Sequence, residues 1–309
     1  MADIQELIPD VYVIPGGTNV GVVRIKSESG CALYLIDSGG SEKDARKIET
    51  ILNAHFTDWQ LRAVINTHSH ADHSGGNAYF AEKTKCGIWM PYLEKGSVEN
   101  TLLQPSIAWG GFPLPELRVP YYVPAYAEPT RIIRAEDCVE FSDGKKIRFI
   151  ALPGHYFEML GVMCTLPDGR CAFFAGDAVF GKKFIAKFSI PFMFDVASFL
   201  DTLEKLCSIH ADRYVPSHGD AVTRIDETAE MNQIAVLQTI SCIMKILKKK
   251  PHTAEELLTE VANANGISMK LAQYVLIGCT LRSFLTSLYE KGRITYEIAD
   301  NKMLWKAVV

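Results

Sequence analysis

The sequence lacks the paired cysteines of a disulfide framework or a zinc finger. Its eight cysteines are scattered through the chain, with no C-x-x-C pair and no metal-finger spacing. Most of their neighbours are apolar, which favours buried, reduced thiols over disulfides. A cysteine-based metal site and a disulfide-stapled fold are therefore not expected.

Segments that direct a chain to a membrane are also missing. The residues up to Gly17 include acidic side chains and have no basic patch followed by an apolar stretch, so they do not resemble a secretory signal. No apolar run reaches the roughly 20 residues that span a bilayer. We therefore expect a cytoplasmic protein that has no membrane partner.

Neither sign of charge is in large excess. The chain has 32 Lys and Arg residues against 36 Asp and Glu residues, a formal net charge of -4. This balance offers no general reason to expect nucleic acid or an anionic membrane as a partner. The 309 residues are 48% apolar and 22% charged, which predicts a sizeable core and excludes wholesale disorder.

The first 225 residues alternate between runs of strand and helix character. Runs rich in β-branched or other apolar residues predict strands at Val11–Ile14, Val20–Ile25, Ala32–Ile36 and Leu61–Ile65. A helix is expected from Ser41 to Ala54, with Ser41 as its N-cap. Later strands are expected at Lys146–Ala151, Val162–Leu166, Cys171–Ala175 and Arg213–Pro216, with a helix at Val196–His210. This succession predicts a layered α/β fold.

Residues 88–132 break this pattern. The segment is rich in proline and in aromatic residues, among them Trp89, Trp109 and Tyr121. A long irregular segment of this kind is often a lid or a binding loop. It can equally pack on its own side chains, and the sequence leaves both interpretations open.

Residues 226–309 are mostly helical in character. A helix is expected over Thr228–Lys249, and another opens at Thr253, where Glu256 stands at capping-box spacing. One or two helices are expected over Met269–Lys291. Two strands joined by a turn at Asp300-Asn301 are expected to follow, at Arg293–Ile298 and Met303–Ala307. Helices followed by a terminal hairpin predict a small winged-helix-like module. We therefore expect two domains, one over residues 1–225 and this module over residues 226–309.

Metal-ligand side chains are concentrated in the stretch Thr67-His68-Ser69-His70-Ala71-Asp72-His73-Ser74-Gly75-Gly76-Asn77. Three of the chain's eight histidines fall within six of these positions. His68 and His70 leave a predicted strand on the same side, because side chains alternate along extended backbone. Asp72 and His73 then begin a helix and can face a second centre. Imidazole and carboxylate ligands suit zinc, manganese or iron better than calcium or magnesium.

Three further candidate ligands follow predicted strands. They are His155 after Lys146–Ala151, Asp177 after Cys171–Ala175, and His218 after the strand that starts at Arg213. Each alone is a weak signal, because a single histidine is more often a hydrogen-bonded structural residue. Together, ligands at the ends of successive strands converge on one edge of a sheet. The remaining histidines are expected to be exposed or structural: His55, His210 and His252.

In this order, the candidate residues resemble the signature of the metallo-β-lactamase-fold superfamily, and the resemblance covers roughly residues 10–222. The seven ligand positions of that family are all present, and an early aspartate stands behind them: His68, His70, Asp72, His73, His155, Asp177 and His218, with Asp37. The resemblance implies an α/β fold in four layers, an αββα sandwich whose two central sheets carry helices on their outer faces.

The resemblance also implies how the ligands are shared. One metal ion would lie on His68, His70 and His155. A second would lie on Asp72, His73 and His218, and Asp177 would bridge the two ions. Asp37 would accept the outer nitrogen proton of a ligand histidine and fix its tautomer. The implied cofactors are two divalent transition-metal ions, zinc first, with manganese or iron as alternatives.

Among the branches of this superfamily, the motif is most similar to that of glyoxalase-II-like and lactonase-like enzymes. Asp177 disfavours the zinc β-lactamases that carry Cys at the bridging position, and His70 disfavours flavodiiron proteins. The chain departs from the glyoxalase II pattern after His155, where Tyr156-Phe157-Glu158 replaces Thr-Pro-Gly. This departure argues against the standard glyoxalase II substrate.

The implied activity is that of a metal-dependent hydrolase. Two dications about 3.5–4 Å apart can hold one bridging water and lower its pKa from about 15.7 towards neutrality. The bridging hydroxide would attack a small ester, thioester, lactone or phosphoester, and Asp72 would be the catalytic group that orients it and moves a proton. A phenylalanine cluster favours an acyl or aromatic substrate unless it is ordinary core: Phe180, Phe184, Phe188, Phe192 and Phe194.

Two alternative functions stay open. The C-terminal module is similar to one in a small endoribonuclease branch, which would indicate nucleic-acid cleavage, but its charges are nearly balanced and it has no aromatic-interleaved basic stripe. A mononuclear iron persulfide-dioxygenase shares the same scaffold. We expect a small-molecule substrate and no nucleic-acid partner. The module is interpreted as an element that covers the pocket or forms a homodimer.

Overall fold

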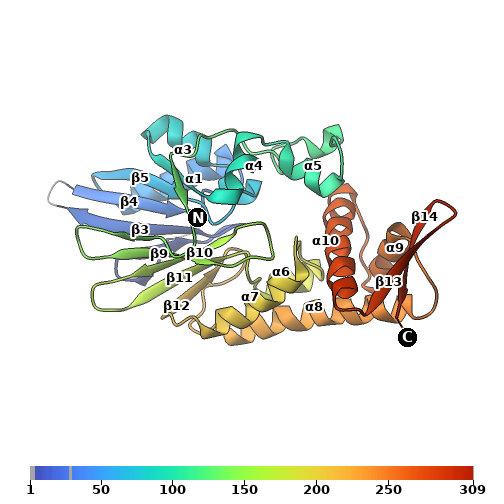
Figure 1. The fold of residues 1–309 in the computed structure, drawn as a ribbon. Helices are drawn as coiled ribbons and strands as arrows, with labels where there is room; N and C mark the ends of the chain where they lie inside the picture. The colour runs from blue at the N-terminus through green and yellow to red at the C-terminus, as the bar shows by residue number, and fades with distance from the viewer. Residues whose placement is uncertain (1–3, 28–29, 309) are drawn as a thin grey trace.

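The computed structural model describes residues 4–27 and 30–308. The outermost limits of the two predicted domains, at residues 1 and 309, lie outside the described residues. Two β-sheets face each other, helices cover their outer faces, and the C-terminal helices stand at one end of the molecule (Figure 1). This is the four-layer αββα arrangement expected from the sequence.

The first sheet has seven strands in sequence order: β1 (Gln5–Ile8), β2 (Val11–Ile14), β3 (Val20–Ser27), β4 (Gly30–Ile36), β5 (Trp59–Ile65), β6 (Gly87–Pro91) and β7 (Arg131–Ile133). Strands β1 to β4 pair antiparallel, whereas β4 to β7 run parallel. The second sheet has the order β12 (Arg213–Pro216), β11 (Cys171–Gly176), β10 (Leu160–Thr165), β9 (Lys146–Ala151) and β8 (Cys138–Glu140). Only its β11–β12 pair is parallel.

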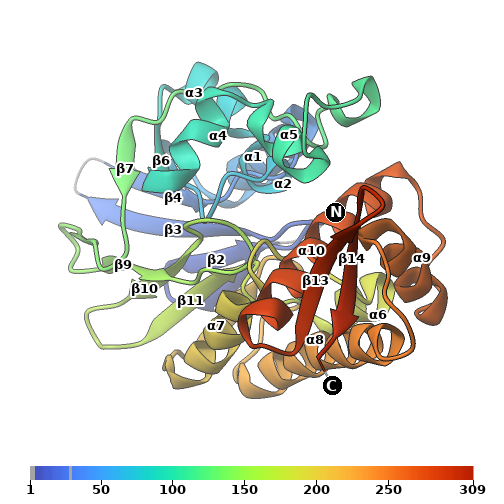
Figure 2. The same ribbon diagram turned by 45° about the vertical axis from the view of Figure 1, so that its right-hand side comes forward.

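Helices connect and cover the sheets. In the first half they are α1 (Glu42–His55), α2 (Ala71–Ser74), α3 (Asn77–Thr84), α4 (Lys95–Glu99) and α5 (Leu103–Trp109), with 3-10 turns η1 (Tyr92–Glu94) and η2 (Pro115–Leu117). In the second half they are α6 (Lys182–Phe188), α7 (Val196–Ser208), α8 (Asp226–Leu247), α9 (Ala254–Ala264) and α10 (Leu271–Glu290). The hairpin β13 (Ile294–Ala299) and β14 (Lys302–Ala307) ends the described chain and lies beside α8 and α10 (Figure 2).

Successive side chains along each strand point to opposite faces of the sheet, and this alternation explains the layered arrangement. Leu35 faces the core under α1 and α3, while its neighbour Ile36 faces the second sheet. In that sheet Phe174 faces back toward the first, and Phe173 faces α7 and the C-terminal helices. Each sheet therefore has two apolar faces, and each face needs a covering layer, which is the physical reason for four layers rather than two.

Most of the predicted elements are confirmed. Strands β2, β9 and β12 have the predicted bounds at both ends. Helix α1 starts after Ser41, whose side chain accepts a hydrogen bond from the amide of Asp44. Helix α9 has the expected capping box between Thr253 and Glu256. Asp300 and Asn301 both have positive φ, as a tight hairpin turn requires.

Other expectations need correction. Residues 88–132 are not wholly irregular, because β6 and β7 add two parallel strands to the first sheet and α4 and α5 lie between them. These strands have five and three residues, too few to show a periodic pattern. The eight cysteines are free, but Cys138 and Cys207 are exposed, so their expected burial is wrong.

The C-terminal helices share their core with the sandwich. Phe173 and Phe199 pack in the same apolar cluster as Ile243 of α8 and Phe284 of α10. Among the described residues, α10 is long and apolar enough to cross a membrane by length and composition, which was not expected from the sequence. Half of its apolar window is buried, as in the core helix of a globular domain.

Candidate metal centre

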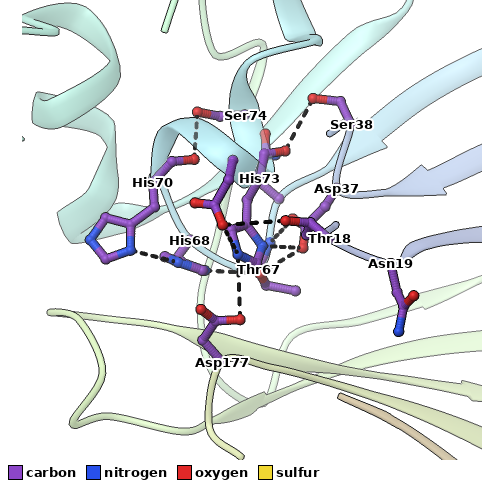
Figure 3. Close-up of polar contacts among 12 residues, drawn as sticks. Thr18, Asn19, Asp37, Ser38, Thr67, His68, His70, His73, Ser74 and Asp177 are labelled. Atoms are coloured by element: carbon purple, nitrogen blue, oxygen red, sulfur yellow. Dashed lines mark hydrogen bonds and ion pairs between the residues drawn. The ribbon is translucent and has the colours of Figure 1, made fainter. Parts of the chain in front are cut away.

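The candidate ligands follow strands that end at one edge of the two sheets. Asp37 follows β4, Thr67 and His68 follow β5, Asp177 follows β11, His218 follows β12, and His155 lies just beyond β9. Helix α2 then carries Asp72 and His73 directly after His70. Figure 3 shows the imidazoles of His68 and His73 beside the carboxylate of Asp177, which rises from the second sheet. The structure thus brings all seven predicted ligands together.

Two glycines allow the loop after β5 to pack closely. A Cβ atom on Gly75 would lie 2.4 Å from the carbonyl carbon of Gly40, and one on Gly76 would lie 2.3 Å from the oxygen of Ser38. Backbone occupies both positions, so a side chain could be accommodated only by moving the loop. This close backbone approach lets α2 pack against the segment that follows β4.

Three imidazole nitrogens meet in the first group of candidate ligands. His70 Nδ1 lies 3.0 Å from His68 Nε2 and 2.9 Å from His155 Nε2. Burial lowers the pKa of His68 and His155, and burial together with the neighbouring His155 lowers the pKa of His70 to about 3. These rings are therefore neutral at physiological pH, the form in which histidine binds a metal ion.

The second group is electrostatically different. His218 Nε2 lies 3.2 Å from Asp72 Oδ2, and His73 Nε2 lies 3.6 Å from the same oxygen. Burial opposes protonation of both rings, but Asp72 and Asp177 outweigh it, raising the pKa of His73 well above its ordinary value and that of His218 to about 10. Without a metal ion, the group forms two ion pairs, in which His73 and His218 share the carboxylate of Asp72.

Asp177 lies between the two groups. Its Oδ2 is 3.4 Å from His155 Nε2 and 3.3 Å from His218 Nε2, while its Oδ1 is 3.4 Å from His73 Nε2. Burial raises the pKa of this carboxyl, but His218, His73 and His155 more than reverse the effect and hold it well below its ordinary value. One ionised carboxylate therefore contacts histidines of both groups.

The outer nitrogens of three candidate ligand histidines are held by acceptors. His73 Nδ1 donates to Asp37 at 2.8 Å, His155 Nδ1 to the carbonyl of Phe192 at 2.9 Å, and His218 Nδ1 to that of Gly17 at 2.7 Å. In the neutral form of each ring the proton stays on this outer nitrogen, and the lone pair of Nε2 faces the centre. The tautomers are thus set by fixed partners.

Asp37 acts on a second histidine through Thr67, a residue to which no role was assigned from the sequence. The hydroxyl of Thr67 donates to Asp37 Oδ2 at 2.9 Å, and its backbone amide donates to Oδ1 at 2.8 Å. The hydroxyl oxygen then accepts from His68 Nδ1, 3.1 Å away. One buried carboxylate therefore orients a histidine of each group.

Two buried atoms at the centre have no hydrogen-bond partner among the described residues. They are His73 Nε2 and Asp177 Oδ1. Leaving a buried polar group unsatisfied costs about 1–3 kcal/mol. The atoms of each of three sets lie within 4.8 Å of one another: His68, His70 and His155; His68, His73 and Asp177; and Asp72, His73 and His218. The donor set and the unsatisfied atoms both fit bound divalent transition metals.

A buried carboxylate outside the ligand set links two of the ligand loops. Glu94 of η1 accepts from the amide and hydroxyl of Ser69, at 3.2 and 2.6 Å, and from the amide of Glu158 at 3.0 Å. Ser69 stands between His68 and His70, and Glu158 follows His155. Burial raises the pKa of Glu94 to about 7. The sequence around Glu94 shows a single glutamate after a short apolar run, and this pattern does not predict its contacts with Ser69 and Glu158.

Replacing Glu94 with Ala is expected to loosen all three ligands of the first group. The change leaves three donors without their acceptor, which should cost about 2–4 kcal/mol of folding free energy. Metal affinity should fall by about 10- to 100-fold, the usual effect of losing an outer-shell partner. Thermal unfolding and competition with a chromophoric chelator measure the two effects. Glu99→Ala, which changes an exposed residue at the end of α4, is the matched control, and equal metal affinity in both variants would contradict the prediction.

A cleft of about 1650 Å³ opens onto the centre, and His70, Asp72, His155, Asp177 and His218 line it. Four of the five phenylalanines singled out in the sequence also line it: Phe180, Phe184, Phe188 and Phe192. Phe194 instead contacts Phe157, with ring centroids 4.3 Å apart and the rings tilted by 50°. From residues 88–132, Gln104, Tyr121 and Tyr122 reach the cleft, so part of that segment borders the site.

Comparisons with known proteins agree with this geometry. A profile of the Metallo-beta-lactamase superfamily matches residues 13–218. A beta-lactamase domain protein from Burkholderia ambifaria has the same fold, with a TM-score of 0.80 at 19% identity, over 99% of this chain and 95% of its own. That likeness extends over the C-terminal helices.

Two curated relatives are enzymes. An atrochrysone carboxyl ACP thioesterase from Emericella nidulans is 24% identical over 318 residues, which span 100% of this chain and 87% of the relative. A hydroxyacylglutathione hydrolase from Rhodopseudomonas palustris is 27% identical over 158 residues, 50% of this chain and 49% of the relative. Both are hydrolases, in agreement with the predicted enzyme class. On the match over residues 13–218, this chain belongs to the metallo-beta-lactamase superfamily.

Proposed function

We propose that the chain is a dinuclear metal-dependent hydrolase that cleaves acyl thioesters or esters. The observation that carries the proposal is the position of Asp177, which contacts histidines of both groups, while its Oδ1 and His73 Nε2 lie 3.4 Å apart and form no hydrogen bond. The proposed ligands are His68, His70 and His155 for one ion, and Asp72, His73 and His218 for the other, with Asp177 shared. Zinc is the proposed metal, with manganese or iron as alternatives.

When bound, the two ions would lower the pKa of a water molecule towards neutrality and polarise the acyl oxygen of the substrate. Asp72 is the proposed catalytic side chain. Its side chain is 40% exposed to the cleft, and Thr18 donates to its Oδ2 at 3.2 Å. Burial raises its pKa, but His73 and His218 reverse this and keep the carboxylate ionised.

An ionised Asp72 can receive a proton from the attacking water and pass it to the leaving atom. In the proposed reaction, the water oxygen bonds to the acyl carbon while the bond from that carbon to sulfur or oxygen breaks. The products are a carboxylic acid and a thiol or alcohol, so no oxidant or reductant is consumed. Thr18 would hold Asp72 in position for both transfers.

Several features support an acyl substrate. Aromatic side chains line the cleft beside the ligands, and Phe184 stacks on His218 with ring centroids 4.9 Å apart. The names of the two curated relatives, a carboxyl ACP thioesterase and a hydroxyacylglutathione hydrolase, point in the same direction. Lactones and phosphoesters, which the same ligands allow, remain further candidates.

The C-terminal segment, proposed as a winged-helix-like module over residues 226–309, has a place in this function. Ala272, Leu276 and Ile277 of α10 line the cleft. This supports a pocket-covering role over nucleic-acid binding. A homodimer formed through the module remains a prediction.

Elemental analysis of protein purified without added metal, combined with a substrate panel, tests the proposal. We expect about two zinc ions per chain and hydrolysis of acyl thioesters or esters. A single iron ion with oxygen uptake would instead indicate a persulfide-dioxygenase-like enzyme. Cleavage or gel retardation of RNA or DNA at physiological salt would indicate the nucleic-acid alternative.

A further inference from the structure

The cleft is larger than a compact substrate needs. Ordinary small-molecule pockets measure roughly 300–1,000 Å³, and this cleft measures about 1650 Å³. Besides the candidate ligands, residues of α1, α6 and α10 line the cleft. A substrate that fills it must extend from the scissile bond, and the lining of this space indicates the chemistry of the extension.

One wall of the cleft is apolar and is built by two segments far apart in the sequence. α6 and the loop after it contribute Phe184, Phe188 and Phe192, and the C-terminal segment contributes Ile267, Leu276 and Ile277. Phe192 also contacts His70, with ring centroids 5.5 Å apart. The wall therefore begins at the metal centre and continues outward along α10.

The C-terminal part of this wall is fixed in place. The amide of Met193 donates to Thr280 Oγ1 at 3.1 Å, and Ser283 Oγ donates to the carbonyl of Phe194 at 2.6 Å. These two contacts attach the loop that carries Phe192 to α10. Since they anchor the two segments of this wall to each other, α10 forms part of the binding site and does not lie in a separate module beside it.

Cationic side chains line the same cleft. Lys47 is paired with Asp44 at 3.2 Å, and Lys183 with Asp220 at 3.8 Å. Lys182 and Lys187, both exposed on α6, form no ion pair with any carboxylate in the described ranges. Two ammonium groups that form no ion pair in the described ranges would complement an anion on the substrate, and the Nζ of Lys187 lies 4.8 Å from the centre of the Phe188 ring.

We propose that the cleft binds acyl thioesters whose thiol portion carries a phosphate, as in phosphopantetheine. The apolar acyl group would lie against Phe192 and Leu276, and the phosphate would lie at Lys182 and Lys187. This deepens the proposed function and rests on it for the cleavage step. Coenzyme A and the prosthetic arm of a carrier protein both supply this chemistry, and the test separates them.

Binding of uncleavable thioethers tests the proposal without relying on catalysis. The probes are decyl and ethyl thioethers of coenzyme A, and the decyl thioether of a phosphopantetheinylated carrier protein, each titrated calorimetrically. Lys182→Ala combined with Lys187→Ala should weaken binding of the phosphate-bearing probes by about 10-fold or more and reduce its salt dependence. Leu276→Trp should weaken the decyl probes by about 10-fold and leave the ethyl probe unchanged.

Matched controls lie outside the cleft. They are Lys245→Ala with Lys302→Ala, which removes two exposed lysines, and Leu237→Trp on the exposed face of α8. Wild-type binding by the controls and weaker binding by the cleft variants support the proposal. Binding confined to the carrier-linked probe supports it with the carrier as the source.

Wild-type affinity in both cleft variants, or failure of the wild-type protein to bind any probe, would overturn the proposal. If the probes bind as expected but no acyl thioester is hydrolysed, the binding inference stands and the proposed function falls. If thioesters are hydrolysed with no effect of the lysine or leucine changes, the proposed function stands and this inference falls.

Discussion

Asp177→Ala is expected to lose bound metal and hydrolytic activity together. Asp177 contacts His155 of the first group and both His73 and His218 of the second, at 3.3–3.4 Å. Its loss therefore removes a contact from both groups at once. Its loss should lower kcat/KM by more than the roughly 10- to 100-fold caused by losing an outer-shell partner. Metal content should fall from about two ions per chain to one or fewer.

Two further variants sharpen this experiment. Asp177→Asn preserves the shape of the side chain but removes its charge, and it should also lose metal, because a neutral amide is a weaker ligand for a divalent ion. Asp201→Ala, on the exposed face of α7, is the control for loss of a carboxylate. Full metal content and full activity in Asp177→Ala would refute its bridging role.

A steep pH dependence of metal loading is expected at only one of the two groups. Asp72 and Asp177 outweigh the effect of burial and raise the pKa of His218 to about 10, and they hold the pKa of His73 well above its ordinary value. Both rings are therefore protonated near neutral pH, and a metal ion must displace both protons. Its apparent affinity should rise by up to about 100-fold per pH unit between pH 6 and 8.

The other group is expected to load almost independently of pH over the same range. Burial and the neighbouring His155 lower the pKa of His70 to about 3, and the pKa values of His68 and His155 are lowered as well. No proton has to leave these rings when the pH is well above those values. The metal affinity of this group should decline only at acid pH, where the three imidazole rings begin to be protonated.

Calorimetric titration of chelator-treated protein distinguishes the two groups. Zinc is added in buffers with different ionisation enthalpies, and the number of released protons follows from the dependence of the heat on buffer. We expect about two protons for one ion and close to none for the other. His218→Ala should remove about one proton from the larger value. Equal proton release by both ions would contradict the assignment.

Much of the fold could be predicted from local pattern. Strands β9 and β12 have the predicted bounds, because their apolar runs are limited by turn or charged residues. Helix α9 starts as predicted, because the bonds between Thr253 and Glu256 form within one turn of helix. Strands β6 and β7 were missed because they are short and are stabilised by pairing with distant parts of the chain.

The ligand residues were recognisable because the pattern of metal binding is itself local. His68 to His73 lie within one loop and one helical turn, and the other candidates each follow a strand. Glu94 was not recognisable, since its partners Ser69 and Glu158 lie 25 and 64 residues away. The contribution of α10 to the cleft was missed for the same reason.

The sequence by itself determined which side chains are available as ligands and where strands present them, because strand alternation, turns and caps depend on neighbouring residues. Only the tertiary structure decided how these side chains are used. Burial lowers the pKa values of three imidazoles, carboxylates raise those of two others, and α10 closes the wall of the cleft. Each of these effects depends on charges and surfaces that folding brings together from distant segments. The size of the pKa shifts and the shape of the cleft therefore cannot be predicted from any local sequence pattern.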